Sequence, residues 1–234
     1  MGALVFNVTT AALMVLMFKG AVALVGEGPL RERATPWAAV GLTALVVLGL
    51  VTQLSWSGAM AAFDSDPARS GWWRIVTSVF MQNGGPFGDA WNIATIAVMA
   101  ALAEWFWGGP LMLGLFAAGI LLPTWVDMLV GTSERSTDPR NFAGSSGATY
   151  FLAATLAAPL LLRVLRAGVN KATATDALFA VGVPVLGLAM WFAQSNGHGL
   201  VAVYGFLLGA VLRLLVRPAA PRPAPAREGA VHTV

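Results

Sequence analysis

Residues 144–164 read GSSGATYFLAATLAAPLLLRV, and this stretch decides the fold class. No charged residue occurs between Gly144 and Arg163, and most of the side chains are apolar. About 20 residues of α-helix cross the roughly 30 Å hydrocarbon layer of a bilayer. The segment therefore predicts a transmembrane helix, placed at residues 146–164, with a cluster of glycine and serine at its start.

The composition of the whole chain supports this interpretation. The 234 residues are 57% hydrophobic and 11% charged, whereas soluble domains average about 45–50% apolar and about 25% charged residues. This excludes both a water-soluble globule and a disordered chain. The chain has no cysteine and only two histidines, His198 and His232, so we expect neither a metal site nor a cofactor. In a membrane protein the positions of the basic residues report the topology, so the net charge of +3 does not lead us to expect a nucleic-acid partner.

Seven stretches are long and apolar enough to cross a bilayer. They cover residues 3–25, 37–56, 91–107, 110–130, 146–164, 176–194 and 199–216. The first has no basic residue before Lys19, unlike a signal peptide, so we expect a retained span. The predicted fold class is therefore all-α, a polytopic membrane protein with seven spans.

Lysine and arginine are distributed unevenly between the two sides of this arrangement. One side carries nine basic residues, which are Arg31, Arg33, Arg163, Arg166, Lys171, Arg213, Arg217, Arg222 and Arg227. The other side carries four, which are Arg69, Arg74, Arg135 and Arg140. Because the more basic side faces the cytoplasm, we expect the N-terminus outside and the C-terminus in the cytoplasm, in the plasma (cytoplasmic) membrane. The loop 57–90 then lies outside, where its aromatic residues predict contact with the membrane interface.

Ser146 and His198 are polar residues within spans, where such residues are functional candidates. At 1.5 Å per residue, both lie about 22–28 Å from the arginines at the inner ends of their helices. They therefore share a level in the outer half of the bilayer. Each also begins a stripe rich in small residues, which permits close helix packing. The stripes are Ala202, Gly205 and Gly209 after His198, and Tyr150, Ala153 and Ala157 after Ser146.

A serine hydroxyl becomes a strong nucleophile when a base accepts its proton, and histidine is the usual base. No carboxylate is obviously placed to orient His198, so the pattern predicts a Ser–His dyad. The backbone N–H groups at the start of the Ser146 helix and the Asn92 side chain are candidate oxyanion donors. Gly144 and Gly147 permit a sharp entry into this helix. Tight helix packing also explains a serine here, and the spacing leaves both interpretations open.

The sequence at this point resembles the rhomboid family of intramembrane serine proteases. The resemblance marks Ser146 rather than Ser145 as the nucleophile, His198 as the base, and Asn92 with the Ser146 N–H as the oxyanion site. It implies structural roles for the remaining motif residues. These motifs are Trp73-Arg74 before Thr77 and Phe80, Glu104 with Gly108, Gly144 and Gly147 around the serines, Tyr150, and Gly205 after the histidine.

The resemblance implies three regions in the chain. Residues 1–36 form an extra N-terminal transmembrane helix with a cytoplasmic loop, residues 37–217 a six-helix rhomboid core, and residues 218–234 a disordered cytoplasmic tail rich in Pro, Ala and Arg. It further implies a serine endopeptidase that lies in the lipid bilayer and cleaves transmembrane protein substrates near its outer face. Neither the substrate nor the oligomeric state is predicted.

Two positions depart from the family pattern. Gly88 stands where the family has a histidine that contributes to the oxyanion site, and Gln82 or Asn83 is a candidate replacement. Val201 stands where the family often has a glycine. The main alternative is therefore a rhomboid-fold pseudoprotease that binds transmembrane clients without cleavage. A transporter or channel is the third interpretation.

Overall fold

The computed structural model describes residues 3–26, 33–130, 142–171 and 173–216. Within these ranges the protein is helical and contains no β-strand. Seven described helices are long and apolar enough to cross a membrane. They are α1 (Ala3–Val25), α2 (Trp37–Ser55), α5 (Gly85–Trp107), α6 (Gly109–Val130), α7 (Ser146–Ala167), α8 (Ala174–Gln194) and α9 (Gly197–Leu215). The protein is thus an all-α polytopic membrane protein, as predicted; the tail 218–234 lies outside the described residues.

The ends of the helices agree with the sequence except at α5. This helix begins at Gly85, whereas the predicted span began at residue 91. The sequence GGPFGD suggests a turn, but Pro86 lies in the first helical turn, where no intrahelical N–H is needed and the fixed φ of proline suits a helix. As a result Gly88 lies on α5, one turn before Asn92.

The loop expected between residues 57 and 90 contains two short helices, α3 (Ala59–Phe63) and α4 (Arg74–Thr77). Arg74 joins them, because its Nη1 donates to the carbonyl oxygens of Ala61 and Asp64, both at 3.1 Å, and lies 3.2 Å from the Asp64 carboxylate. Arg69 pairs with the same carboxylate at 3.2 Å. Asp64 is therefore neutralised by two arginines, and the loop is a fixed structure.

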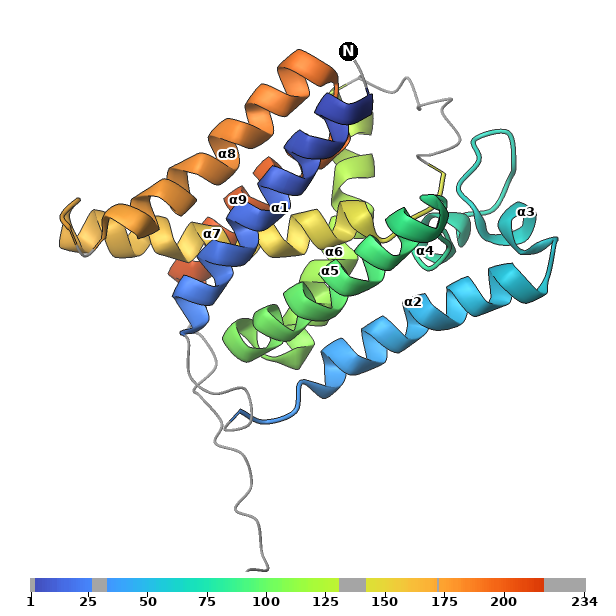
Figure 1. The fold of residues 1–234 in the computed structure, drawn as a ribbon, viewed down its shortest axis with the longest axis horizontal. Coiled ribbons are helices and arrows are strands. Elements are labelled where there is room, and N and C mark those ends of the chain that lie inside the picture. Colours follow the sequence, from blue (N-terminus) through green and yellow to red (C-terminus); the bar gives the residue numbers. More distant parts are fainter. Residues whose placement is uncertain (1–2, 27–32, 131–141, 172, 217–234) are drawn as a thin grey trace, which may run out of the picture.

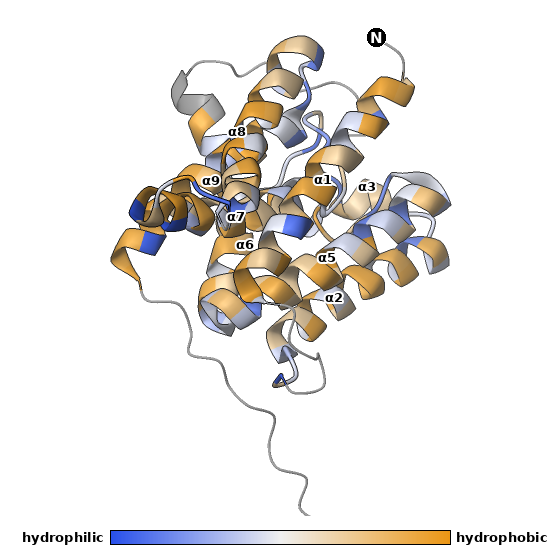
Figure 2. Cartoon of the chain, turned by 60° about the vertical axis from the view of Figure 1, so that its left-hand side comes forward, coloured by the Kyte–Doolittle hydropathy of each residue, from blue (hydrophilic) through white to orange (hydrophobic). Residues whose placement is uncertain are grey.

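Helix α7 lies at the centre of the molecule. In its apolar window, 78% of the residues are buried inside the protein, against 22–33% in the other six spans. Figure 1 shows α8, α1, α5 and α2 running side by side, with α7 crossing behind α1. The hydrophobic colour covers most of the outer surfaces of the helices in Figure 2, which suits a surface in contact with lipid.

Helices α7 and α9 approach each other through glycine. Gly205 lies against the carbonyl group of Phe151, and a Cβ on Gly209 would lie 2.5 Å from the carbonyl oxygen of Thr155. The small-residue stripe of α9 is thus at the interface, as predicted. The prediction for α7 differs in detail, because these glycines face the backbone at Phe151 and Thr155 rather than Ala153 and Ala157.

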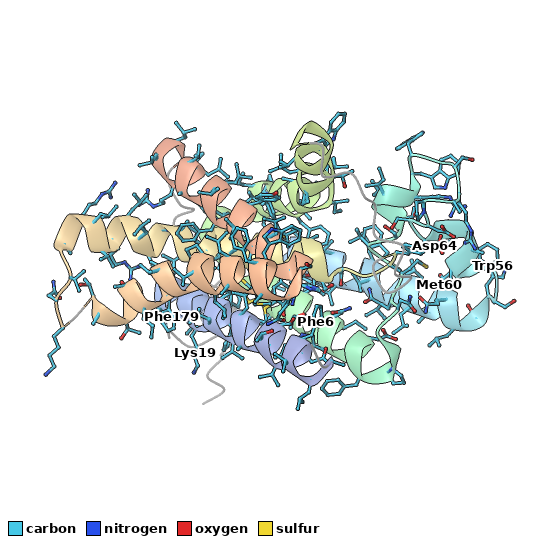
Figure 3. All side chains as sticks on the ribbon, turned by 90° about the horizontal axis from the view of Figure 1, so that it is seen from above. Phe6, Lys19, Trp56, Met60, Asp64 and Phe179 are labelled. Atoms are coloured by element: carbon cyan, nitrogen blue, oxygen red, sulfur yellow. The ribbon has the colours of Figure 1, made fainter. Side chains whose placement is uncertain are left out.

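Helix α1 lies between α8 and α5 and also contacts α7. Its C-terminal half packs closely on α8, where a Cβ on Gly20 would lie 3.2 Å from the Cβ of Phe179. Figure 3 shows Lys19 and Phe179 near one end of α1 and Phe6 toward the other. The N-terminal half of α1, which includes Phe6, lies beside the start of α9.

Glu104 of α5 caps the N-terminus of α2. Its Oε2 accepts a hydrogen bond of 2.7 Å from the backbone N–H of Ala39. No side chain of α2 caps this end, where Pro36 is the N-cap residue. The first N–H groups of a helix have no intrahelical partner, so Glu104 supplies an acceptor and a favourable charge from a neighbouring helix.

We predict that Glu104→Ala lowers the free energy of unfolding by about 0.5–2 kcal/mol, the usual effect of losing a helix cap. Glu104→Gln retains an acceptor oxygen and is expected to lose less. Thermal unfolding of the three proteins in one detergent measures this order. A Glu104→Ala protein as stable as the wild type would contradict the capping role.

Candidate active site

The structure brings Ser146 and His198 into contact. Ser146 is the first residue of α7, and His198 is the second residue of α9. Their Oγ and Nε2 atoms lie 2.9 Å apart, which is hydrogen-bonding distance. Both residues are partly exposed, whereas Tyr150 and Asn196, which contact His198, are buried. This is the geometry that a serine nucleophile and a general base require.

Two aromatic rings hold the imidazole of His198. The ring of Tyr150 lies edge-on to it, with centroids 4.8 Å apart, and the ring of Phe6 lies at 6.3 Å. Tyr150 is buried, and its hydroxyl donates a hydrogen bond of 2.7 Å to the backbone carbonyl of Thr10. Tyr150 of α7, four residues after Ser146, thus contacts His198. Phe6 of α1 contacts the same imidazole, which sequence reasoning did not anticipate.

Asn196 is a second contact that sequence reasoning missed. It is the N-cap residue of α9 and is fully buried. Its Oδ1 accepts from the backbone N–H of His198 at 3.0 Å and lies 3.1 Å from the imidazole Nδ1. Its Nδ2 donates to Thr10 Oγ1 at 2.9 Å. The signal in the sequence was an asparagine two residues before the histidine, which is easily interpreted as an ordinary helix cap.

Gly144 leaves a small space between Asn92 and Ser146. A Cβ built on Gly144 would lie 3.8 Å from Ser146 Oγ and 3.9 Å from Asn92 Nδ2. Gly144 has a φ of +136°, and its N–H donates to the carbonyl of Ser78 at 3.0 Å. The positive φ therefore favours glycine at the turn into α7, and the position that its Cβ would take lies within 4 Å of both the serine hydroxyl and the Asn92 amide.

Gln82 comes from the loop before α5 and lies beside Asn92. Its backbone is fixed to α2, because Gln53 donates to its carbonyl at 2.7 Å and accepts from its N–H at 3.0 Å. Its side-chain Oε1 accepts from Asn92 Nδ2 at 2.8 Å. Gln82, the candidate replacement for the family histidine, thus contacts Asn92, the candidate oxyanion residue. At Gly88 itself, no atom lies within 4 Å of the position that a Cβ would take.

Two buried side-chain polar atoms among the described residues have no hydrogen-bond partner, Gln82 Nε2 and Ser145 Oγ. Both residues are fully buried. One contacts Asn92, and the other directly precedes Ser146. Buried polar groups are nearly always paired, and exceptions call for a functional or structural reason. Unused hydrogen-bonding capacity is therefore concentrated around Asn92 and Ser146.

The other residues singled out by the sequence make their contacts elsewhere. Arg74 holds the loop between α2 and α5, and Glu104 caps the start of α2, as described above. Trp73 precedes α4 and is 46% exposed. Gly205 holds α9 against α7, and Gly147 lies in the first turn of α7. In the part of the chain that the structure describes, no three His, Asp or Glu side chains gather to hold a metal ion.

No family model matches this chain, and no curated protein matches its sequence. The resemblance to rhomboid proteases therefore depends on the motifs themselves and on the geometry of the residues that carry them.

We predict opposite effects of alanine at the two glycines that flank the serines. Gly144→Ala forces a side chain into a positive φ, which costs on the order of 1–3 kcal/mol. Gly147 is helical with no atom within 4 Å of an added Cβ, so Gly147→Ala is expected to gain up to about 1 kcal/mol from helix propensity. Thermal unfolding of both variants tests the pair. A Gly144→Ala protein as stable as the wild type would show that the entry into α7 does not depend on glycine at this position.

Proposed function

We propose that this protein is an intramembrane serine endopeptidase of the rhomboid type. The observation that carries the proposal is the 2.9 Å contact between Ser146 Oγ and His198 Nε2, made by two membrane-spanning helices. A serine and a histidine in contact at this depth are expensive to keep in a bilayer without a function. Their position in the order of the rhomboid motifs further supports the proposal.

In the proposed reaction, Ser146 Oγ attacks the carbonyl carbon of the scissile peptide while His198 Nε2 accepts the hydroxyl proton. The tetrahedral adduct collapses by breaking the C–N bond, and His198 gives the proton to the leaving amine. Water then hydrolyses the acyl-enzyme, with His198 acting again as base and then as acid. The hydrolysis consumes one water and needs no cofactor.

The negative oxygen of the tetrahedral adduct requires hydrogen-bond donors. Ser146 begins α7, so its backbone N–H has no partner within the helix. Asn92 Nδ2 borders the space next to Ser146 Oγ, and Gln82 Nε2 is an unused donor beside Asn92. We assign these groups to the oxyanion site. Gln82 supplies the donor that a histidine supplies in the rhomboid family, at the position where this chain has Gly88.

The proposed substrates are transmembrane proteins whose helices unwind near the outer face of the membrane. The excess of lysine and arginine on the opposite side of the spans supports an external N-terminus and a cytoplasmic C-terminus in the plasma membrane. Ser146 and His198 lie at the ends of α7 and α9 remote from Arg163 and Arg213. The site is therefore assigned to the outer half of the bilayer.

A pseudoprotease that binds transmembrane clients is the second candidate. Two observations favour it. No atom lies within 4 Å of the position that a Cβ would take at Gly88, and Asn92 Nδ2 already donates a hydrogen bond to Gln82 Oε1. An amide already bonded to a neighbour is a weaker donor for an oxyanion. The two candidates differ in one respect, which is whether Ser146 is reactive.

We predict that a fluorophosphonate probe labels the purified wild-type protein in detergent. Labelling should be lost in Ser146→Ala and His198→Ala, because one removes the nucleophile and the other the base. It should be retained in Ser145→Ala, a matched control that removes the neighbouring hydroxyl. A wild-type protein that neither labels nor cuts a model transmembrane substrate would leave the client-binding candidate in place of the protease.

A second prediction concerns Gln82. Gln82→Met and Gln82→Glu both lack the side-chain N–H donor, and the Glu variant retains an acceptor for Asn92. If Gln82 donates to the oxyanion, both variants lower the labelling rate by about 10²–10³-fold, the effect of losing one such donor. Asn83→Ala, which changes the neighbouring exposed residue, should retain the wild-type rate. A normal rate in Gln82→Glu would limit Gln82 to holding Asn92 in place.

A further inference from the structure

We infer that Asn196, held from its far side by Thr10 of α1, is a positioning residue that sets the tautomer of His198. The sequence predicts a dyad, because no carboxylate is available to orient the imidazole. The structure supplies an amide in that place, with Asn196 Oδ1 at 3.1 Å from His198 Nδ1. Asparagine orients the base in Cys–His–Asn sites of other folds. For catalysis, the inference rests on the proposed protease function.

The orientation of the Asn196 amide follows from its other contacts. The backbone N–H of His198 can only donate, and it lies 3.0 Å from the amide atom assigned as Oδ1. The reverse orientation would place an NH₂ group against this N–H. On the other side, the Thr10 hydroxyl donates to the carbonyl of Phe6 at 2.7 Å, so its oxygen accepts from Asn196 Nδ2. Both neighbours require the same orientation of the amide.

An acceptor beside Nδ1 determines the form of the neutral imidazole. Nδ1 must carry the proton, because Asn196 Oδ1 has none to give, and Nε2 is then the unprotonated nitrogen. Nε2 is the atom that faces Ser146 Oγ at 2.9 Å. The chain of hydrogen bonds thus runs from Ser146 to His198, from His198 to Asn196 and from Asn196 to Thr10. It leaves the serine hydroxyl donating to a free lone pair, as a general base requires.

Asn196 is also rigid in this position. It is fully buried, and the residue before it, Ser195, takes a left-handed conformation with φ of 50° at the end of α8. Thr9 of α1 reaches Gln194 at the same end of α8, with Oγ1 3.0 Å from Oε1. Helix α1 therefore contacts both the capping asparagine and the helix that precedes it, and contributes directly to the order of the site.

A capping role for Asn196 makes a different prediction. Serine is also a good N-cap residue, but its side chain is too short to keep the cap and reach the imidazole together. Asn196→Ser should therefore retain α9 and lose the contact with Nδ1. Asn196→Asp retains an acceptor for both N–H groups. Thr10→Val has a similar shape to the native threonine and removes only the hydroxyl that accepts from Asn196.

The experiment measures the tautomer directly. The chain has two histidines, so ¹⁵N-histidine labelling of a His232→Gln background leaves His198 as the single imidazole in the NMR spectrum. We expect the Nδ1–H form in the background protein and in Asn196→Asp. Asn196→Ser should give a mixture with the Nε2–H form, and Thr10→Val a smaller change in the same direction. An Nε2–H form in the background protein, or an unchanged tautomer in Asn196→Ser, would overturn the inference.

The labelling rate with the fluorophosphonate probe gives the second readout. We expect a loss on the order of 10²–10⁴-fold in Asn196→Ser, comparable to losing the orienting residue of a triad, and a rate within about 10-fold of wild type in Asn196→Asp. If the wild-type protein never labels, the protease proposal fails, but the tautomer series still decides the role of Asn196. If Asn196→Ser unfolds, Thr10→Val provides the same test without touching the cap.

Discussion

The contact between α7 and α9 is the constraint on which the rest of the structure depends. Gly205 and Gly209 bring the backbones of the two helices together, because any side chain at these positions would meet the carbonyl groups of α7. Ser146 and His198 lie at the starts of these helices, so the distance between them is set by packing about two to three turns further along α9. The other helices surround α7 and exclude lipid from it.

Burial of α7 in turn requires that polar groups near the site find partners within the protein, because bilayer hydrocarbon offers none. The partners come from segments far apart in the sequence. Thr10 of α1 accepts from Asn196 and, through its backbone carbonyl, from Tyr150, while Gln53 of α2 holds the loop that carries Gln82. Helix α1 is thus part of the polar framework around His198.

The seven spans could be predicted from the sequence because hydropathy over about 20 residues is a strong signal. The equal depth of Ser146 and His198 and the small residues of α9 suggested that the two could meet, but on α7 the contact uses the backbone at Phe151 and Thr155 instead of the predicted alanines. The start of α5 at Gly85 was missed because Pro86 and its glycines suggest a turn. Gln82 was a candidate from its place in the loop, but its fixation by Gln53 and that of Asn196 by Thr10 could not be predicted, because these partners lie more than 25 residues away in the sequence. The place of α1 between α8 and α5 has no signal in a helix that is apolar on every side.

The two sides of Ser146 differ in how fully their hydrogen bonds are used. On the histidine side, the amide of Asn196 and the hydroxyl of Thr10 are engaged in directions that their neighbours require. On the asparagine side, Gln82 Nε2 is buried without a partner, and the same holds for the Oγ of Ser145, the residue that precedes Ser146. A fully satisfied network resists movement, whereas unpaired donors in a low-dielectric site favour a ligand that completes them. For the proposed hydrolase this division is physically appropriate, since the base must remain oriented throughout the reaction and the oxyanion donors are needed only when negative charge develops.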